Sequence, residues 1–161
     1  MTRRLPPSHA PFEPEFVEAL TDLFERKVTF NRIIGLEVVS IAAERVTGRI
    51  GMRPELVGNF GYRRLHGGVI SAGLDAMAGL AVMAALGARH RSDTVAQRLA
   101  RFERIGTIDL RVDYLHPGIG DRFDLSAEVM RIGSRVASVR MEFRGADGAL
   151  LSTGTAAYIV S

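Results

Sequence analysis

The sequence contains no cysteine and only one lysine, Lys27. Without cysteine, neither a disulfide framework nor thiolate chemistry is available, and a reducing compartment such as the cytoplasm is expected. Almost all of the positive charge is arginine, and the net charge at pH 7 is only +3. No basic segment alternates with aromatic residues, so nucleic-acid binding is not predicted, although scattered arginines could contact a small polyanionic ligand.

Targeting and metal-binding patterns are also missing. Residues 1–7 are basic, but no apolar segment follows them, so a signal peptide is not expected. The four histidines lack the close pairing and the neighbouring carboxylates of a metal site. We therefore predict a protein without a metal or a redox cofactor. Its 161 residues suit one domain.

The longest apolar segment, residues 69–86, consists almost entirely of small and aliphatic residues, and Asp75 is its only charge. With about 18 residues, the segment reaches the lower limit for crossing a bilayer. A central carboxylate and many small side chains favour a buried helix of a soluble protein instead. Burying a charge is costly unless the charge has partners or a function, so Asp75 is the first candidate for a functional residue.

The rest of the chain predicts one more helix and six strands. Residues 1–11 are expected to form a loose arm, and residues 14–28 an amphipathic helix that begins at Pro14. We expect residues 55–65 to form a loop that leads to His66, and Gly87 to end the apolar helix. Residues 88–101 should form a loop or a short helix capped by Asp93. Turn residues and period-two patterns place strands at 36–43, 45–53, 106–115, 122–132, 136–143 and 150–160.

This order of elements predicts an α+β fold, in which a curved six-stranded antiparallel sheet wraps around a central Ala/Gly-rich helix. The linkers at 133–134 and 146–148 are short enough for hairpins, so the last three strands should be antiparallel neighbours. We expect an N-terminal arm and helix over 1–29 and the core of the domain over 30–161.

The sequence His66-Gly67-Gly68 precedes the apolar helix. Nine helical residues rise about 13 Å, so His66 and Asp75 of one chain cannot meet if the helix starts at the glycines. Such a start lacks a Ser, Thr, Asp or Asn cap, and its first N–H groups could polarise a carbonyl. Asp75 could act with them only from a second chain, which predicts a site shared by two antiparallel helices of a homodimer.

Three segments resemble the hotdog-fold acyl-CoA thioesterases of the phenylacetate-pathway and 4-hydroxybenzoyl-CoA type. They are residues 65–68 with the following Asp75, the strand 106–117 and the closing segment 148–156. The likeness covers about residue 30 to the C-terminus, and it is greatest to a bacterial branch that acts on medium- and long-chain acyl-CoA. It implies a hotdog fold, thioester hydrolysis with coenzyme A only as part of the substrate, and a homodimer that pairs into a tetramer.

The resemblance also implies a role for each matching residue. Asp75 would be the general base or the nucleophile, and the N–H of Gly67, with that of Gly68, would bind the thioester oxygen. His66 would orient this loop, and Thr107 would help to position water. Substrate contacts are expected from Asn59, which stands seven rather than six positions before the histidine, from Leu74, Met77 and Ala78 along an acyl tunnel, and from Arg131, Gly133, Ser134 and Arg135 at a turn near the CoA tail.

Each of these residues also has a purely structural interpretation. Asp75 could be a buried carboxylate bonded to backbone, the glycines could serve a tight turn, and Thr107 could be an ordinary strand residue. The arginines of the turn could be solvated. Two other functions remain open. A hotdog acyl-CoA hydratase normally has a helical histidine near its aspartate, which is missing here, and an acyl-CoA-binding module would usually carry a regulatory segment larger than the helix at 14–28.

Overall fold

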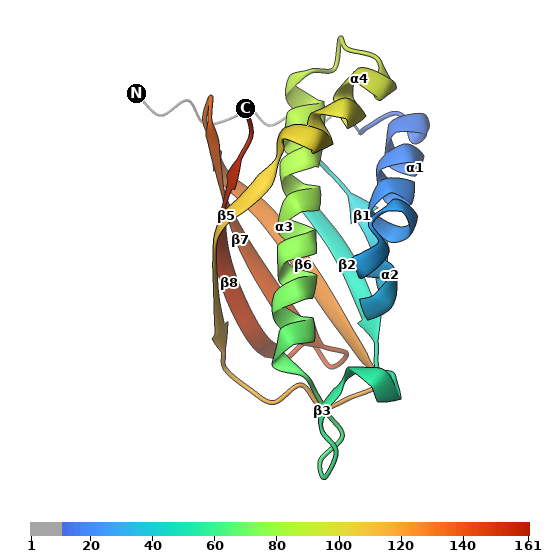
Figure 1. The fold of residues 1–161 in the computed structure, drawn as a ribbon, viewed down its shortest axis with the longest axis vertical. Helices are drawn as coiled ribbons and strands as arrows, with labels where there is room; N and C mark the ends of the chain where they lie inside the picture. Colours follow the sequence, from blue (N-terminus) through green and yellow to red (C-terminus); the bar gives the residue numbers. More distant parts are fainter. Residues whose placement is uncertain (1–10) are drawn as a thin grey trace.

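The computed structural model describes residues 11–161, so most of the expected arm at 1–11 lies outside the described residues. A six-stranded antiparallel sheet curves around one long helix, α3, and a layer of short helices covers one side (Figure 1). The predicted α+β architecture is therefore confirmed. The helices are α1 (Pro14–Asp22), a π-helical turn (Leu23–Lys27), α2 (Thr29–Ile34), α3 (Gly67–Arg89), α4 (Val95–Ala100) and two 3₁₀ turns (Pro54–Leu56 and Arg101–Arg104).

The sheet has the strand order β1-β2-β6-β7-β8-β5, and every neighbouring pair is antiparallel. Its inner face is apolar, whereas its outer face carries paired charges such as Arg49 with Asp124 at 3.1 Å. The six strands are β1 (Leu36–Ile41), β2 (Arg45–Gly51), β5 (Gly106–Tyr114), β6 (Arg122–Ile132), β7 (Val136–Gly145) and β8 (Leu150–Ile159), and a separate small hairpin is formed by β3 (Val57–Asn59) and β4 (Arg64–Leu65).

Both edge strands of the sheet contain an irregularity. In β1 the register shifts between Val38 and Ser40, and in β5 it shifts between Thr107 and Asp109. Each shift inserts one residue that has no partner on the neighbouring strand, which is a β-bulge.

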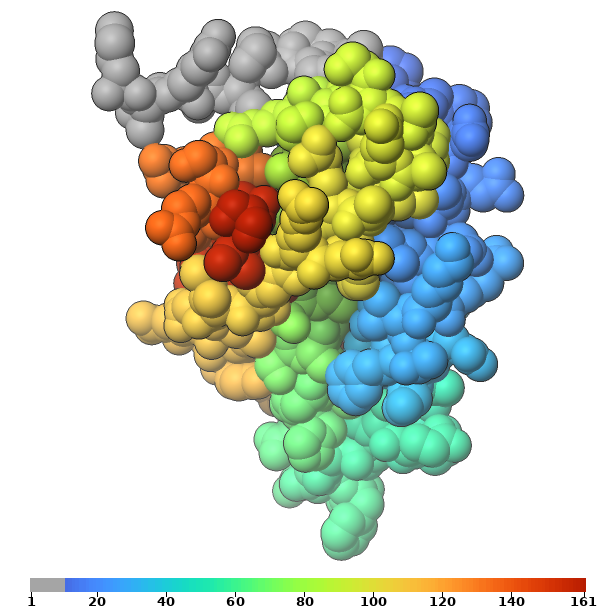
Figure 2. Space-filling model, turned by 45° about the horizontal axis from the view of Figure 1, so that its top comes forward, coloured from blue at the N-terminus to red at the C-terminus, as the bar shows by residue number. Residues whose placement is uncertain are grey.

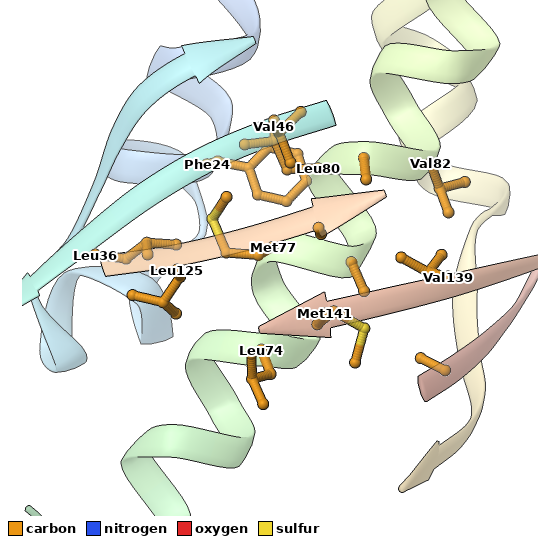
Figure 3. Packing of buried hydrophobic residues seen from close by; sticks show 14 of the residues in the cluster. Phe24, Leu36, Val46, Leu74, Met77, Leu80, Val82, Leu125, Val139 and Met141 are labelled. Atoms are coloured by element: carbon orange, nitrogen blue, oxygen red, sulfur yellow. The ribbon is translucent and has the colours of Figure 1, made fainter. Parts of the chain in front are cut away.

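The helix α3 fills the concave side of the sheet. Leu74 and Met77 point from it toward Leu125 on β6 and Met141 on β7 (Figure 3). By length and by a mean hydropathy of 1.9 this helix could cross a membrane, but 78% of its most apolar 18-residue stretch is buried inside the protein. The interpretation as the buried helix of a soluble fold is therefore favoured over a membrane span.

The prediction that α3 ends at Gly87 is wrong, because the helix continues to Arg89. Gly87 serves packing instead: a side-chain carbon at this position would collide with the ring of Phe16 on α1. The Arg89 side chain then donates hydrogen bonds to the carbonyls of Ile132, at 2.6 Å, and Gly133, at 3.2 Å, which fixes the end of α3 to the turn between β6 and β7.

Three local predictions need correction. The N-terminal helix does not run unbroken over 14–28, because α1 passes into a π-helical turn and a second short helix, α2, follows. The segment after α3 does form a short helix, but its N-cap is Thr94, in a capping box with Gln97, rather than Asp93. The expected loop at 55–65 contains the β3–β4 hairpin.

Candidate active site

Asp75 lies on the half-exposed side of α3. Its Oδ1 accepts two hydrogen bonds, from the hydroxyl of Thr107 at 2.8 Å and from the hydroxyl of Tyr158 at 2.5 Å. Within residues 11–161 no donor contacts the other carboxylate oxygen, Oδ2. The carboxylate is therefore held through one oxygen and presents the other.

The bulge in β5 determines that Thr107 faces Asp75. Leu110 and Val112 are half-buried, and strict alternation from them would bring Ile108 to the inner face and turn Thr107 outward. The extra residue in β5 reverses this phase, so Thr107 pairs with Tyr158 on β8 and its hydroxyl reaches Asp75. The structure thus brings Thr107 to the carboxylate, as the resemblance implied.

Sequence reasoning missed Tyr158. Its side chain is buried, and its hydroxyl also lies 2.6 Å from the main-chain oxygen of Asp75. Burial, followed by the hydrogen bond with the Asp75 carboxylate, raises the pKa of Tyr158, so the phenol stays protonated and remains a donor. A signal was present, because a tyrosine at a core position of a strand needs a partner for its hydroxyl.

The expectation of an uncapped helix start is wrong. His66 is the N-cap of α3, and its Nδ1 accepts a hydrogen bond from the Gly68 N–H at 2.8 Å. Gly68 is therefore engaged and is not a free donor for a substrate oxygen. The Gly67 N–H has no acceptor in the described part of the chain, whereas the Gly67 carbonyl accepts a hydrogen bond from the Tyr114 hydroxyl at 3.0 Å.

Gly58 supports this helix start from the β3–β4 hairpin. A side-chain carbon at Gly58 would lie 2.7 Å from the Cα of His66 and 2.9 Å from its Cβ, which is too close for any residue but glycine. His66 thus packs directly on the backbone of the hairpin, and the hairpin fixes where the capping side chain lies.

A cavity of about 410 Å³ adjoins Gly67. Tyr114 and His116 line it on the side of β5, and Arg64 lines it on the side of the hairpin. Neither Arg64 nor His116 has an ion-pair partner among residues 11–161. The cavity therefore offers two unpaired basic side chains beside the free Gly67 N–H.

The carboxylate and the free N–H are far apart within one chain. Because α3 begins at Gly67, eight helical residues separate Gly67 from Asp75, a rise of about 12 Å. Because the helix starts at Gly67, His66 and Asp75 of one chain cannot meet, as predicted. No thioester carbonyl can contact both groups of a single subunit at once.

The structure places Leu74, Met77 and Ala78, which were expected to line an acyl tunnel, in the core, where all three are 0% exposed. They lie on the side of α3 that faces the sheet. The half-exposed stripe of α3 consists instead of Ser71, Ala72, Asp75 and Ala76. Figure 2 shows α3, in green, reaching the surface between the blue N-terminal helices and the amber segment that includes β5.

The other predicted substrate residues lie away from Asp75. Asn59 is at the hairpin, where its Oδ1 accepts a hydrogen bond from the Gly61 N–H at 3.1 Å. Arg131 lies near the end of β6, and the turn with Gly133, Ser134 and Arg135 joins β6 to β7 beside the C-terminal end of α3. This end is 14 helical residues, or about 21 Å, from Asp75 of the same chain. In residues 11–161 no group of three or more histidine or acidic side chains is arranged to hold a metal ion.

Comparison with known proteins identifies the family. A family model described as "Thioesterase superfamily" matches residues 62–152, which is more than half of the chain. The chain belongs to the thioesterase superfamily. The family inferred from the sequence is thus confirmed, and the thioesterase is a thioester hydrolase with the hotdog fold.

Individual relatives cover almost the whole thioesterase. It is 37% identical to "Medium/long-chain acyl-CoA thioesterase YigI" of Salmonella typhimurium and of Escherichia coli K12, over 139 residues that span 86% of this chain and 90% of each relative. It also matches a crystal structure from Shewanella oneidensis, of a protein related to the thioesterase superfamily, with a TM-score of 0.85 and 37% identity. That match covers 91% of this chain and 96% of the other.

Proposed function

We propose that this protein hydrolyses medium- and long-chain acyl-CoA thioesters to the free acid and CoA, as part of fatty acid metabolism in the cytoplasm. The observation that carries the proposal is the carboxylate of Asp75, which two hydroxyls hold through Oδ1 while Oδ2 is open. The names of the YigI relatives support this substrate class. The unpaired Arg64 and His116 beside Gly67 suit the phosphates of CoA.

The reaction takes place in a site shared by two subunits. Ser71 lies halfway between Gly67 and Asp75 along α3, so a two-fold axis beside it would bring Gly67 of one subunit opposite Asp75 of the other. The small half-exposed residues around Ser71 allow two antiparallel copies of α3 to approach each other. Exposed apolar residues at the same end, Tyr114, Leu115 and Ile119, extend this surface. The resulting dimer could pair further into a tetramer.

In the shared site, each group acts on a different atom of the substrate. The thioester oxygen accepts a hydrogen bond from the Gly67 N–H at the positive end of the helix dipole, which stabilises the developing oxyanion by about 3–4 kcal/mol. Asp75 of the other subunit activates a water molecule, a contribution of about 10²–10⁴-fold. Thr107 orients the carboxylate. The acyl chain lies along the half-exposed stripe of α3 rather than against Leu74 and Met77.

The first experiment measures thiol release from acyl-CoAs of increasing chain length by wild type and Asp75→Asn. We expect turnover of medium and long chains, and a loss of about 10²-fold or more in the folded variant. A wild type that binds acyl-CoA tightly and releases no thiol would contradict hydrolysis and favour a binding module.

Mixed dimers test the shared site. Gly67→Pro removes the N–H at the first helical position, where proline is tolerated, and the extended backbone of His66, with ψ 133°, suits a residue before proline. Each homodimer should be inactive. After random mixing with Asp75→Asn subunits, half of the dimers contain one subunit of each variant. Each mixed dimer has one intact site of two, so about a quarter of the wild-type activity should return. If no activity returned, the whole site would have to lie within one chain.

A further inference from the structure

Tyr158 bridges two different groups of Asp75. Its hydroxyl oxygen lies 2.5 Å from the carboxylate Oδ1 and 2.6 Å from the main-chain oxygen of the same residue. The phenol thus lies against α3 at Asp75, and its single proton is shared between the side chain and the main-chain oxygen of that residue.

The bridge restricts the rotamer of Asp75. Rotation about χ1 would carry Oδ1 away from both the Tyr158 and the Thr107 hydroxyls, and a carboxylate loses stabilisation when it loses charge-assisted donors. The backbones of both donor residues are fixed, because Thr107 and Tyr158 are direct partners across β5 and β8. One pair of residues in the sheet therefore sets the orientation of the carboxylate.

The burial of Tyr158 makes it a dependable donor. The ring is buried between β7, β5 and α3, so water does not compete for its hydroxyl. Its raised pKa keeps the proton on the phenol throughout the neutral range. Thr107 is exposed by comparison, and its hydroxyl can exchange partners with solvent.

We infer that Tyr158 is a positioning residue of the hydrolysis, which holds Oδ1 of Asp75 so that Oδ2 alone receives the proton of the attacking water. The inference rests on the proposed hydrolysis. It assigns the proton to one carboxylate oxygen and gives Asp75 the role of a general base rather than that of a nucleophile.

The step balances without any other reactant. Oδ2 takes a proton from water while the water oxygen forms a bond to the thioester carbonyl carbon. The carbon–sulfur bond then breaks, and the CoA thiolate leaves with its electron pair. The thiolate takes up the proton from Oδ2, which regenerates the carboxylate and releases the free acid. Tyr158 keeps its own proton throughout and contacts neither the water nor the substrate.

The test compares Tyr158→Phe with a matched control, Tyr62→Phe, whose side chain is 73% exposed on the hairpin. Removing the Tyr158 hydroxyl should lower kcat by about 10–100-fold and leave KM within about twofold, because the substrate does not touch it. Tyr62→Phe should retain wild-type kcat and KM. In the Asp75→Asn background, Tyr158→Phe should cause no further loss, because the carboxylate that it positions is gone.

The outcomes separate the two proposals. A wild type without turnover contradicts the proposed function itself. Turnover by wild type and an equal kcat in folded Tyr158→Phe contradicts the role of Tyr158 alone, as does a full additional loss in the Asp75→Asn background. Single turnover in H₂¹⁸O tests the base assignment: the label should enter only the released acid, and label in the side chain of Asp75 would make Asp75 the nucleophile.

Discussion

The Nδ1 atom of His66 accepts a hydrogen bond from the Gly68 N–H at 2.8 Å, so a histidine caps the helix that carries Asp75. This contact gives the two glycines at the helix start different roles. The Gly68 N–H donates to the capping histidine. The Gly67 N–H has no acceptor among the described residues, so it is the one of the pair that is left free for a substrate oxygen. The histidine thereby helps to hold in place the Gly67 N–H that we propose as the oxyanion donor.

The capping role predicts different outcomes for two His66 variants. His66→Ala removes the acceptor and should lower the free energy of unfolding by about 1 kcal/mol, with a loss of kcat as the first helical turn frays. His66→Asn supplies another capping acceptor and should retain most stability and most activity. Urea denaturation and thiol release measure both. A stable but inactive His66→Asn would show that the histidine transfers protons.

Gly58 predicts an effect at a distance from the carboxylate. In Gly58→Ala the new methyl group would meet His66, so the cap and the Gly67 N–H should shift and kcat/KM should fall. Gly51→Ala is the matched control, because a side-chain carbon there meets nothing within 4 Å. Steady-state kinetics on both variants should separate them, and equal activity would mean that the hairpin does not position the cap.

Thr107 can be tested with two substitutions of similar size. Thr107→Val keeps the shape but loses the hydroxyl that contacts Oδ1, and kcat should fall about tenfold or more. Thr107→Ser keeps the donor and should stay close to wild type. If Thr107 were an ordinary strand residue, both folded variants would keep the wild-type kcat, and Thr107→Val would be the more stable of the two, since valine favours strands.

Gly87 and Gly79 predict opposite changes in stability on the same helix. Replacing a helical glycine with alanine normally stabilises by about 1 kcal/mol. Gly79→Ala should follow this rule, because its methyl group would make ordinary contacts of 3.6 Å or more. Gly87→Ala should destabilise instead, because Phe16 occupies the space. Thermal or urea unfolding gives both signs, and a more stable Gly87→Ala would contradict the packing.

The raised pKa of Tyr158 predicts an alkaline loss of stability. The folded state favours the neutral phenol, whereas a tyrosine in the unfolded chain ionises near pH 10. The stabilisation is therefore complete below about pH 10 and declines as the pH rises above it. The difference in the free energy of unfolding between wild type and Tyr158→Phe should shrink between about pH 8 and pH 11. A constant difference would contradict the shift.

Much of the fold could be predicted from the sequence because its signals are local. Six strands and α3 follow from periodicity and turn residues. The capping box of Thr94 with Gln97 was also readable, but the neighbouring Asp93 obscured it. Other features depend on contacts between distant segments. Gly87 looks like a helix end until Phe16 packs on it, and only the assembled sheet shows that Leu74 and Met77 are buried in the core.

The candidate site also combines residues with a local signal in the sequence and residues that only distant contacts bring together. Asp75 stands out as a lone charge in an apolar segment, and the family resemblance pointed to Thr107. Tyr158 could not be placed beside Asp75, because the two are 83 positions apart and only the closing of the sheet brings them together. The alternation in β5 even predicts the wrong neighbour, since a regular strand would present Ile108 to the carboxylate.

The bulges at the two edges of the sheet also bear on solubility. An edge strand with an unbroken row of N–H and C=O groups is a template on which further chains can pair, and such growth has no natural end. In this protein both β1 and β5 are interrupted, at Val39 and at Ile108. Each bulge disfavours regular pairing of that edge with another chain, which works against fibril-like extension of the sheet.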